Sequence, residues 1–97
     1  GLTSLGQNYP NPFNPVTNIT YNVGFVDGPQ QQVNLSIYNI LGQHVQTLFR
    51  GQQGPGQYSI MWHGRDKSGV SVASGIYFVH MTTSAGQVQT KKVMLLR

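Results

Sequence analysis

The chain has 97 residues, enough for one domain with a modest core, and only 8% of them are charged, against a typical value of ~25%. The net charge of +4 reflects missing acids more than abundant bases, and the scattered basic residues argue against nucleic-acid binding. Because the chain has no cysteine, it has no disulfide, thiolate metal site or cysteine nucleophile, and no apolar run reaches the ~18 residues of a membrane-spanning helix.

The first distinctive segment is the proline-rich leader GQNYPNPFNP, residues 6–15. Its prolines are Pro10, Pro12 and Pro15. Proline cannot continue a helix or donate to a central sheet ladder, so we expect an extended segment along a sheet edge. Tyr9 and Phe13 are large and apolar, and we expect them to plug the end of the fold as part of a structural clasp. A binding motif is the alternative interpretation.

Alternating apolar and polar residues predict strands through most of the remaining chain. The predicted strands cover residues 16–25, 33–40, 44–49, 58–63, 76–81 and 87–96. The first places Ile19, Tyr21, Val23 and Phe25 on one face. The strand at 76–81 is apolar on both faces apart from His80, so it should lie centrally in a sheet. Turns or loops are predicted at 27–29, 41–43, 51–57, 64–75 and 84–86. These patterns predict an all-β sandwich of six or seven strands.

Catalytic chemistry has little support in the sequence. The only acids, Asp27 and Asp66, lie in turn-like stretches where aspartate commonly caps the backbone, so a glycosidase pair is not expected. His44, His63 and His80 lack the short spacing of a metal site. Counting does not exclude a Ser-His-Asp arrangement, but nothing resembles a nucleophile elbow. We therefore expect a domain that is not an enzyme and that needs no metal or cofactor.

The aromatic residues of the middle segment admit two interpretations. Trp62, Tyr58 and Tyr77 could stack against sugars, which would favour a carbohydrate-binding or adhesive module of a secreted enzyme. However, Trp62 is in phase with Ile60 and Tyr58, as the core tryptophan of a sandwich is. The spacing favours a core position for Trp62.

The tail TKKVMLLR, residues 90–97, carries two adjacent lysines on a predicted strand. Adjacent side chains of a strand point to opposite faces, so Lys91 is in phase with Val93 and Leu95. Lys92 is in phase with Thr90, Met94 and Leu96. Spacing alone favours an edge strand that charge protects against aggregation. The alternative is a strand end offered to a partner.

Several motifs occur together and in order along nearly the whole chain, from about Leu5 to Arg97. They are LGQNYPNPFNPVTNITY, VNLSIYNILGQHVQTLF, GQYSIMWHGRD, SGVSVASGIYFV and TKKVMLLR. Together they resemble the type A C-terminal sorting domain of the bacterial type IX secretion system, and the segment from WHGRDKSG to ASGIYFV is similar to an Ig-like domain of a flagellar hook-capping protein. His63 departs from the family pattern, which usually has an acidic or amide residue there.

The resemblance implies a fold and a function. The fold is an antiparallel Ig-like β-sandwich of about seven strands, forming one domain over residues 1–97, with 1–5 as linker remnant, 6–15 as leader and 16–97 as sandwich. The function is a non-catalytic secretion signal that takes a fused N-terminal cargo from the periplasm to the cell surface or medium, and that is usually processed there. The implied partners are the outer-membrane translocon, its shuttle components and a surface sortase.

The resemblance also assigns residues. Those implied to be recognised by the translocon are Thr90, Lys91, Lys92, Val93, Met94, Leu95, Leu96 and Arg97. Those implied to serve the framework are Tyr9, Pro10, Pro12, Phe13, Leu41, Gly42, Trp62, Gly75 and Tyr77.

Overall fold

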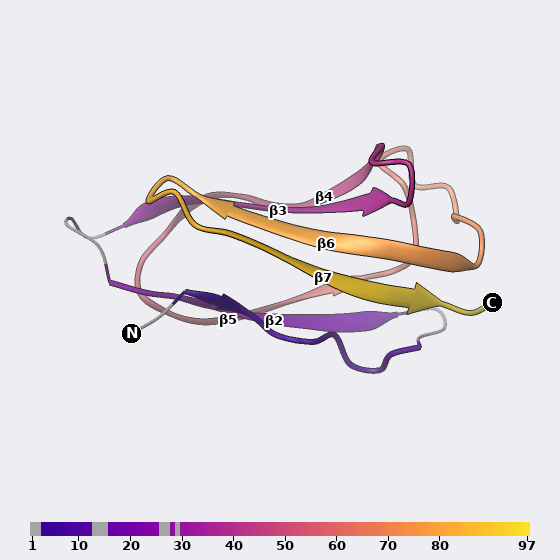
Figure 1. Cartoon of the computed structure of the whole chain (residues 1–97), viewed down its shortest axis with the longest axis horizontal. Helices are drawn as coiled ribbons and strands as arrows, with labels where there is room; N and C mark the ends of the chain where they lie inside the picture. Colours follow the sequence, from indigo (N-terminus) through magenta and orange to yellow (C-terminus); the bar gives the residue numbers. More distant parts are fainter. Residues whose placement is uncertain (1–2, 13–15, 26–27, 29) are drawn as a thin grey trace.

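The computed structural model describes residues 3–12, 16–25, 28 and 30–97, and these residues form two antiparallel sheets (Figure 1). One sheet has the order β1-β2-β5, with β1 at Ser4–Leu5, β2 at Thr17–Val23 and β5 at Gly56–Trp62. The other has the order β4-β3-β6-β7, with β3 at Gln31–Asn39, β4 at His44–Gln53, β6 at Gly75–Thr83 and β7 at Val88–Leu95. The predicted all-β sandwich of about seven strands is confirmed.

The core lies between the two sheets and follows the alternation of the strands. The buried apolar side chains are Leu5, Ile19, Tyr21, Val23, Val33, Leu35, Ile37, Val45, Trp62, Tyr77, Val79, Met81, Val93 and Leu95. Every strand contributes to this cluster, because alternate side chains of each strand point inward. Among the described residues no helix is present, and so none is long and apolar enough to cross a membrane.

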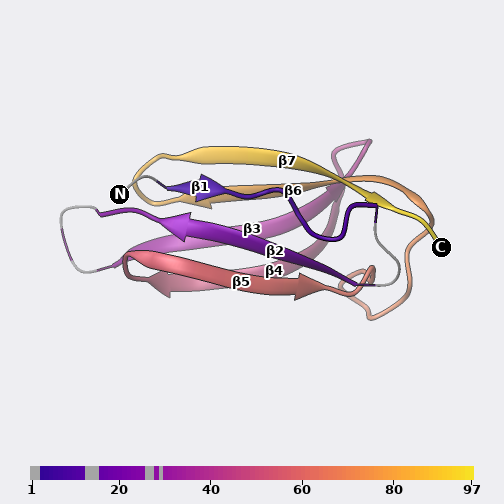
Figure 2. The ribbon, with the colours of Figure 1, turned by 90° about the horizontal axis from the view of Figure 1, so that it is seen from below.

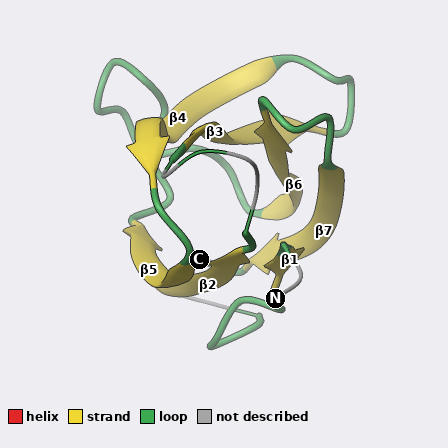
Figure 3. Cartoon of the chain, turned by 90° about the vertical axis from the view of Figure 1, so that its left-hand side faces the viewer, coloured by secondary structure: helices red, strands yellow, loops and turns green. Residues whose placement is uncertain are grey.

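The arrangement of strands confirms two expectations from the sequence. β6, which is apolar on both faces, lies centrally between β3 and β7. β7, which carries the charged tail, is the outer strand of its sheet. An end-on view shows that β7 lies next to β1 on one side of the sandwich, whereas β4 lies next to β5 on the other (Figure 3). The two sheets therefore meet along two seams.

Several local predictions were wrong. Phe25 was expected to face inward, but β2 ends at Val23 and Phe25 is exposed. The predicted loop at 51–57 is mostly strand, because Gly51 pairs with Val33 and β5 already begins at Gly56. A side chain at Gly51 would lie 3.2 Å from the Phe49 ring, so glycine there makes room for that ring and does not break the strand.

Candidate functional site

The predicted recognition tail is divided by the fold into a buried and a reachable half. Val93 and Leu95 have no exposed surface, and Lys91, on the same face, is half-buried. Thr90 and Lys92 are exposed, Met94 is half-buried and Leu96 is 51% exposed. The alternation expected from the sequence is thus observed along β7, and in the folded domain a partner can reach Thr90, Lys92 and Leu96 fully and Met94 in part.

Arg97 is held by the loop that connects β5 to β6. Its backbone N–H donates to Ser74 Oγ at 2.9 Å. Its guanidinium donates from Nε to Val72 O and from Nη2 to Gly64 O, both at 2.6 Å. The side chain remains exposed, but these three bonds fix the last residue of the chain against the body of the sandwich.

The leader closes the seam between β1 and β7 (Figure 2). Gln89 of β7 accepts a hydrogen bond from Leu5 N–H at 2.7 Å and donates one to Thr3 O at 3.0 Å. Farther along, Gln7 Nε2 donates to Lys92 O at 3.0 Å, and Met94 N–H donates to Asn11 Oδ1 at 2.9 Å. Side-chain amides of the leader thus occupy backbone positions on the outer edge of β7, where an additional strand would otherwise pair.

The leader is anchored to β2 by a buried polar network. Asn8 is 4% exposed, and its Nδ2 donates to Thr17 Oγ1 at 2.7 Å and to Pro10 O at 3.0 Å. The Thr17 hydroxyl donates to Pro10 O at 2.8 Å. Tyr9 pairs with Asn18 of β2 through two backbone bonds, which confirms the extended segment along a sheet edge.

The expectation that Tyr9 plugs the end of the sandwich was wrong. The Tyr9 ring is 81% exposed, because the side chain that points inward at this place is Asn8. Phe13, the other predicted plug, lies outside the described residues. Pro10 and Pro12 are exposed on the same segment.

Trp62 lies in the core, as its phase with Ile60 predicts. Its ring is 2% exposed and meets Tyr77 edge-on, with ring centroids 5.2 Å apart. Its indole N–H donates to Arg65 O at 3.0 Å, which satisfies the one polar atom of the side chain. A buried tryptophan cannot stack against a polysaccharide, so this observation removes the main support for a carbohydrate-binding module.

The residues from the two glycine motifs lie at turns of the framework. Gly42 has a φ of +78°, a conformation that favours glycine, and its N–H donates to Asn39 O to close the β3–β4 turn. Gly75, at the start of β6, has a φ of +153°. Leu41 lies in the same turn as Gly42, but its side chain is 77% exposed and packs into no core.

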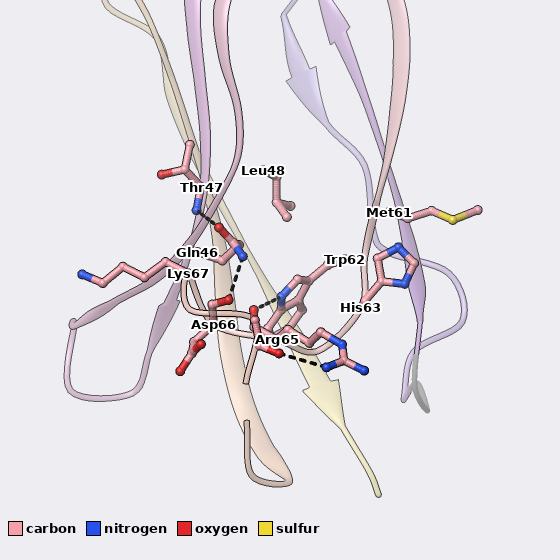
Figure 4. Close-up of a pocket in the computed structure, with 10 residues that line it drawn as sticks. Gln46, Thr47, Leu48, Met61, Trp62, His63, Arg65, Asp66 and Lys67 are labelled. Atoms are coloured by element: carbon pink, nitrogen blue, oxygen red, sulfur yellow. Dashed lines mark hydrogen bonds between the residues drawn. The ribbon is translucent and has the colours of Figure 1, made fainter. Parts of the chain in front are cut away.

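A cleft of about 370 Å³ opens beside the β4–β5 seam (Figure 4). Gln46 crosses it, since its Nε2 donates to Asp66 O at 2.9 Å and its Oε1 accepts from Thr47 N–H at 3.0 Å. Asp66 Oδ1 accepts the N–H groups of Ser68 and Val70. Asp66 thus caps a turn, as the sequence predicts, and among the described residues no second carboxylate lines this cleft.

The histidines show no shared chemistry. His44 Nε2 lies 2.9 Å from Thr47 Oγ1, His80 Nδ1 lies 2.8 Å from Thr90 Oγ1, and His63 is exposed. In the described part of the chain, no three histidine or acidic side chains group in a way that could hold a metal ion. Asp27 lies outside the described residues.

Two buried tyrosines, Tyr21 and Tyr77, should make the folded domain less stable at alkaline pH. Burial raises the pKa of Tyr21 and Tyr77 above 10.0, and the nearby Arg97 guanidinium partly opposes the rise for Tyr77. A folded-state pKa above the unfolded value contributes stability that is present below pH ~10 and is lost as the pH rises through the folded pKa. We therefore expect the melting temperature to fall as the pH rises above ~10, and to fall less in Tyr21→Phe and Tyr77→Phe. Thermal melts across this range, with the exposed Tyr9→Phe as control, test this, and equal slopes in all variants would contradict it.

The fold of this chain is similar to parts of several solved protein structures. Dimeric latent PorU from Porphyromonas gingivalis is similar with a TM-score of 0.71 and 20% identity, over 99% of this chain and 10% of that one. PorZ, an essential bacterial surface component of the type IX secretion system of the same organism, is similar with a TM-score of 0.56 and 18% identity, over 98% and 11%. The alkylpurine DNA glycosylase AlkC from Pseudomonas fluorescens, in a complex with DNA containing an abasic site analogue, has a TM-score of 0.62 and 16% identity, over 98% and 30%.

At these identities the structural likeness shows the fold alone, and this chain spans about a tenth of PorU and PorZ and under a third of AlkC. No curated protein matches the chain. The sequence pattern of the FlgD Ig-like domain matches residues 16–87, which run from β2 to the turn before β7. Since this match covers well over half of the residues, the chain belongs to the FlgD Ig-like domain family.

Proposed function

We propose that this domain is a non-catalytic, type A C-terminal sorting signal of the type IX secretion system. Similar folds occur in PorU, in PorZ and in a DNA glycosylase, so the fold by itself does not choose a function. The sequence motifs favour the sorting function, since YPNPFNP, YNILGQ, SGIY and TKKVMLLR occur together and in order. PorZ supports the proposal further, because it is a component of that secretion system.

The single observation that carries the proposal is the position of the tail. Residues 90–97 form the outer strand of a sheet and the segment after it, with Lys92 and Leu96 in solvent. A translocon or shuttle component can therefore contact the tail of a domain that is already folded. In this proposal the fused N-terminal cargo travels from the periplasm to the cell surface or the medium, and a surface sortase processes it there.

The test is export of a fluorescent reporter fused in front of this domain in a type IX-competent bacterium. The parent fusion should reach the surface or the medium. Lys91→Ala with Lys92→Ala should leave at least tenfold more reporter in the periplasm, because the cation of the reachable face is lost. Neither lysine belongs to the buried core, so the purified variant should melt within a few degrees of the parent.

Two results would contradict the proposal. One is a parent fusion that stays in the periplasm although it is folded. The other is a lysine variant that reaches the surface as efficiently as the parent. Arg50→Ala is the matched control, because Arg50 is an exposed cation on β4, the outer strand at the opposite edge of the same sheet.

A further inference from the structure

The tail side chains that solvent can reach belong to a larger surface. On the outward face of the β7 sheet, cross-strand register pairs Thr90 with His80, Lys92 with Phe78 and Met94 with Ile76. Directly opposed residues in an antiparallel pair have Cβ atoms about 4.5–5.5 Å apart, so each tail side chain lies against a β6 neighbour. A partner that touches Lys92 and Met94 from solvent therefore also meets β6.

This surface continues across β3 to an exposed apolar turn. Tyr38 of β3 is opposite Phe78, and the turn that follows β3 places Ile40 and Leu41 in solvent at 70% and 77% exposure. Exposed aliphatic side chains at a turn contribute little to the core, and two adjacent ones at this exposure call for a reason beyond folding. We name Tyr38, Ile40, Leu41, Phe78, Lys92 and Met94 the outer face.

The outer face is hollowed on both sides of the turn. One groove of about 330 Å³ is lined by Tyr38, Ile40, Phe78 and Thr90, among others. A second, of about 250 Å³, lies between the turn and the start of β6 at Gly75 and Ile76. Each groove has the volume of one large side chain or more, and each has an apolar wall from Ile40.

The charge of the outer face limits which partner could bind it. The outer face has one cation, Lys92, and no acidic residue. Of the two acids of the chain, Asp66 lies in the loop between β5 and β6, where its carboxylate accepts backbone N–H groups. Asp27 lies outside the described residues. A partner that complements this surface thus offers a carboxylate opposite Lys92 and an apolar side chain for the grooves beside Ile40.

We propose that the outer face as a whole, and not the linear tail, is the surface by which an export component of the cell envelope recognises the folded domain. The proposal rests on the function proposed above and adds the turn at Ile40 and Leu41 to the site. Val93 and Leu95 act only by holding β7 in place, because their side chains are inaccessible in the folded domain.

The test uses the reporter fusion with Ile40→Ser and Leu41→Ser together. Export should fall at least tenfold, whereas the purified variant should melt within a few degrees of the parent because both side chains are exposed. Two control variants each remove an exposed apolar side chain elsewhere on the domain. Val88→Ser lies at the other end of β7, about 20 Å from Met94, and Met61→Ser lies in the other sheet. Both controls should be exported like the parent.

The outcomes separate this proposal from the one on which it rests. Normal export of the double serine variant, with export lost in the lysine variant, would overturn the outer face and leave the tail alone as the signal. Normal export of the lysine variant would overturn the sorting assignment itself. If the double serine variant melts more than ten degrees lower, Leu41→Arg decides in its place, with the same expected loss.

A second copy of the chain is the other occupant that the test can detect. The purified parent should sediment as a monomer at the concentrations of the melts. A parent dimer that the serine variant disrupts without any loss of export would identify the outer face as a self-association surface and overturn the proposal.

Discussion

Deletion of residues 91–97 is expected to unfold the domain. The deletion removes Val93 and Leu95, which have no exposed surface, and it leaves the space that they fill between the sheets. Loss of one buried Leu or Ile side chain typically costs about 2–5 kcal/mol, and the whole stability of a small domain is about 5–15 kcal/mol. The deletion also removes the part of the β6–β7 ladder that pairs residues 91–95 with residues 75–79, and the three bonds of Arg97.

The measurement is a thermal melt of the purified domain followed by circular dichroism. The truncated chain should show no cooperative transition near that of the parent, whereas Lys91→Ala with Lys92→Ala should keep it. A truncated chain that melts within about five degrees of the parent would contradict the core role of Val93 and Leu95. Loss of export on deleting the tail is therefore expected from unfolding alone, and only substitutions of exposed residues report recognition.

Much of the fold could be predicted because alternation within a strand is a local property of the sequence. The two apolar faces of 76–81 require neighbours on both sides, and β6 has β3 and β7 beside it. The phase of Trp62 with Ile60 places the indole inside. Asp66, within RDKSG, forms the turn that its neighbours predict. Each of these results depends on residues that are close together along the chain.

The errors arise where distant residues decide the structure. Gly51 suggests a loop, but the Phe49 ring occupies the space above it and the strand continues. Tyr9 suggests a core plug, but its backbone pairs with Asn18 of β2 and directs the ring to solvent. The amide contacts from Gln7 and Asn11 to β7 span more than eighty residues, and nothing in the local sequence signals them.

The candidate site shows the same division. The sequence identifies 90–97 as a unit and predicts which of its residues share a face. It cannot show that Leu41, half the chain away, lies in an exposed turn beside the β6 residues that border the tail, because that proximity depends on the order β3-β6-β7. Neither does it show that Arg97 is fixed by carbonyl groups of the β5–β6 loop.

Substitution of Asn8 by alanine is expected to destabilise the domain more than any other single change in the leader. The side chain is buried, and its loss removes one donor to the Thr17 hydroxyl and one to Pro10 O, which keep only the bond to each other. A typical hydrogen bond contributes about 0.5–1.5 kcal/mol, so the loss of two costs about 1–3 kcal/mol, which corresponds to a fall in melting temperature of roughly 5–20 °C for a domain of this size. Because Asn8 also holds the leader against β2, the segment around residues 6–12 should become open to proteases.

Two variants separate this network from the leader's other contacts. Asn8→Asp keeps the size of the side chain but replaces the donor nitrogen by an acceptor oxygen that faces Pro10 O. The single Thr17 hydroxyl proton cannot serve both of these oxygens, so at neutral pH the variant should melt at least as low as the alanine variant. Asn11→Ala removes one exposed bond to β7 and should melt within a few degrees of the parent. If all three variants had the melting temperature and the protease resistance of the parent, the leader would lie on the sandwich without stabilising it, and the structural clasp would be contradicted.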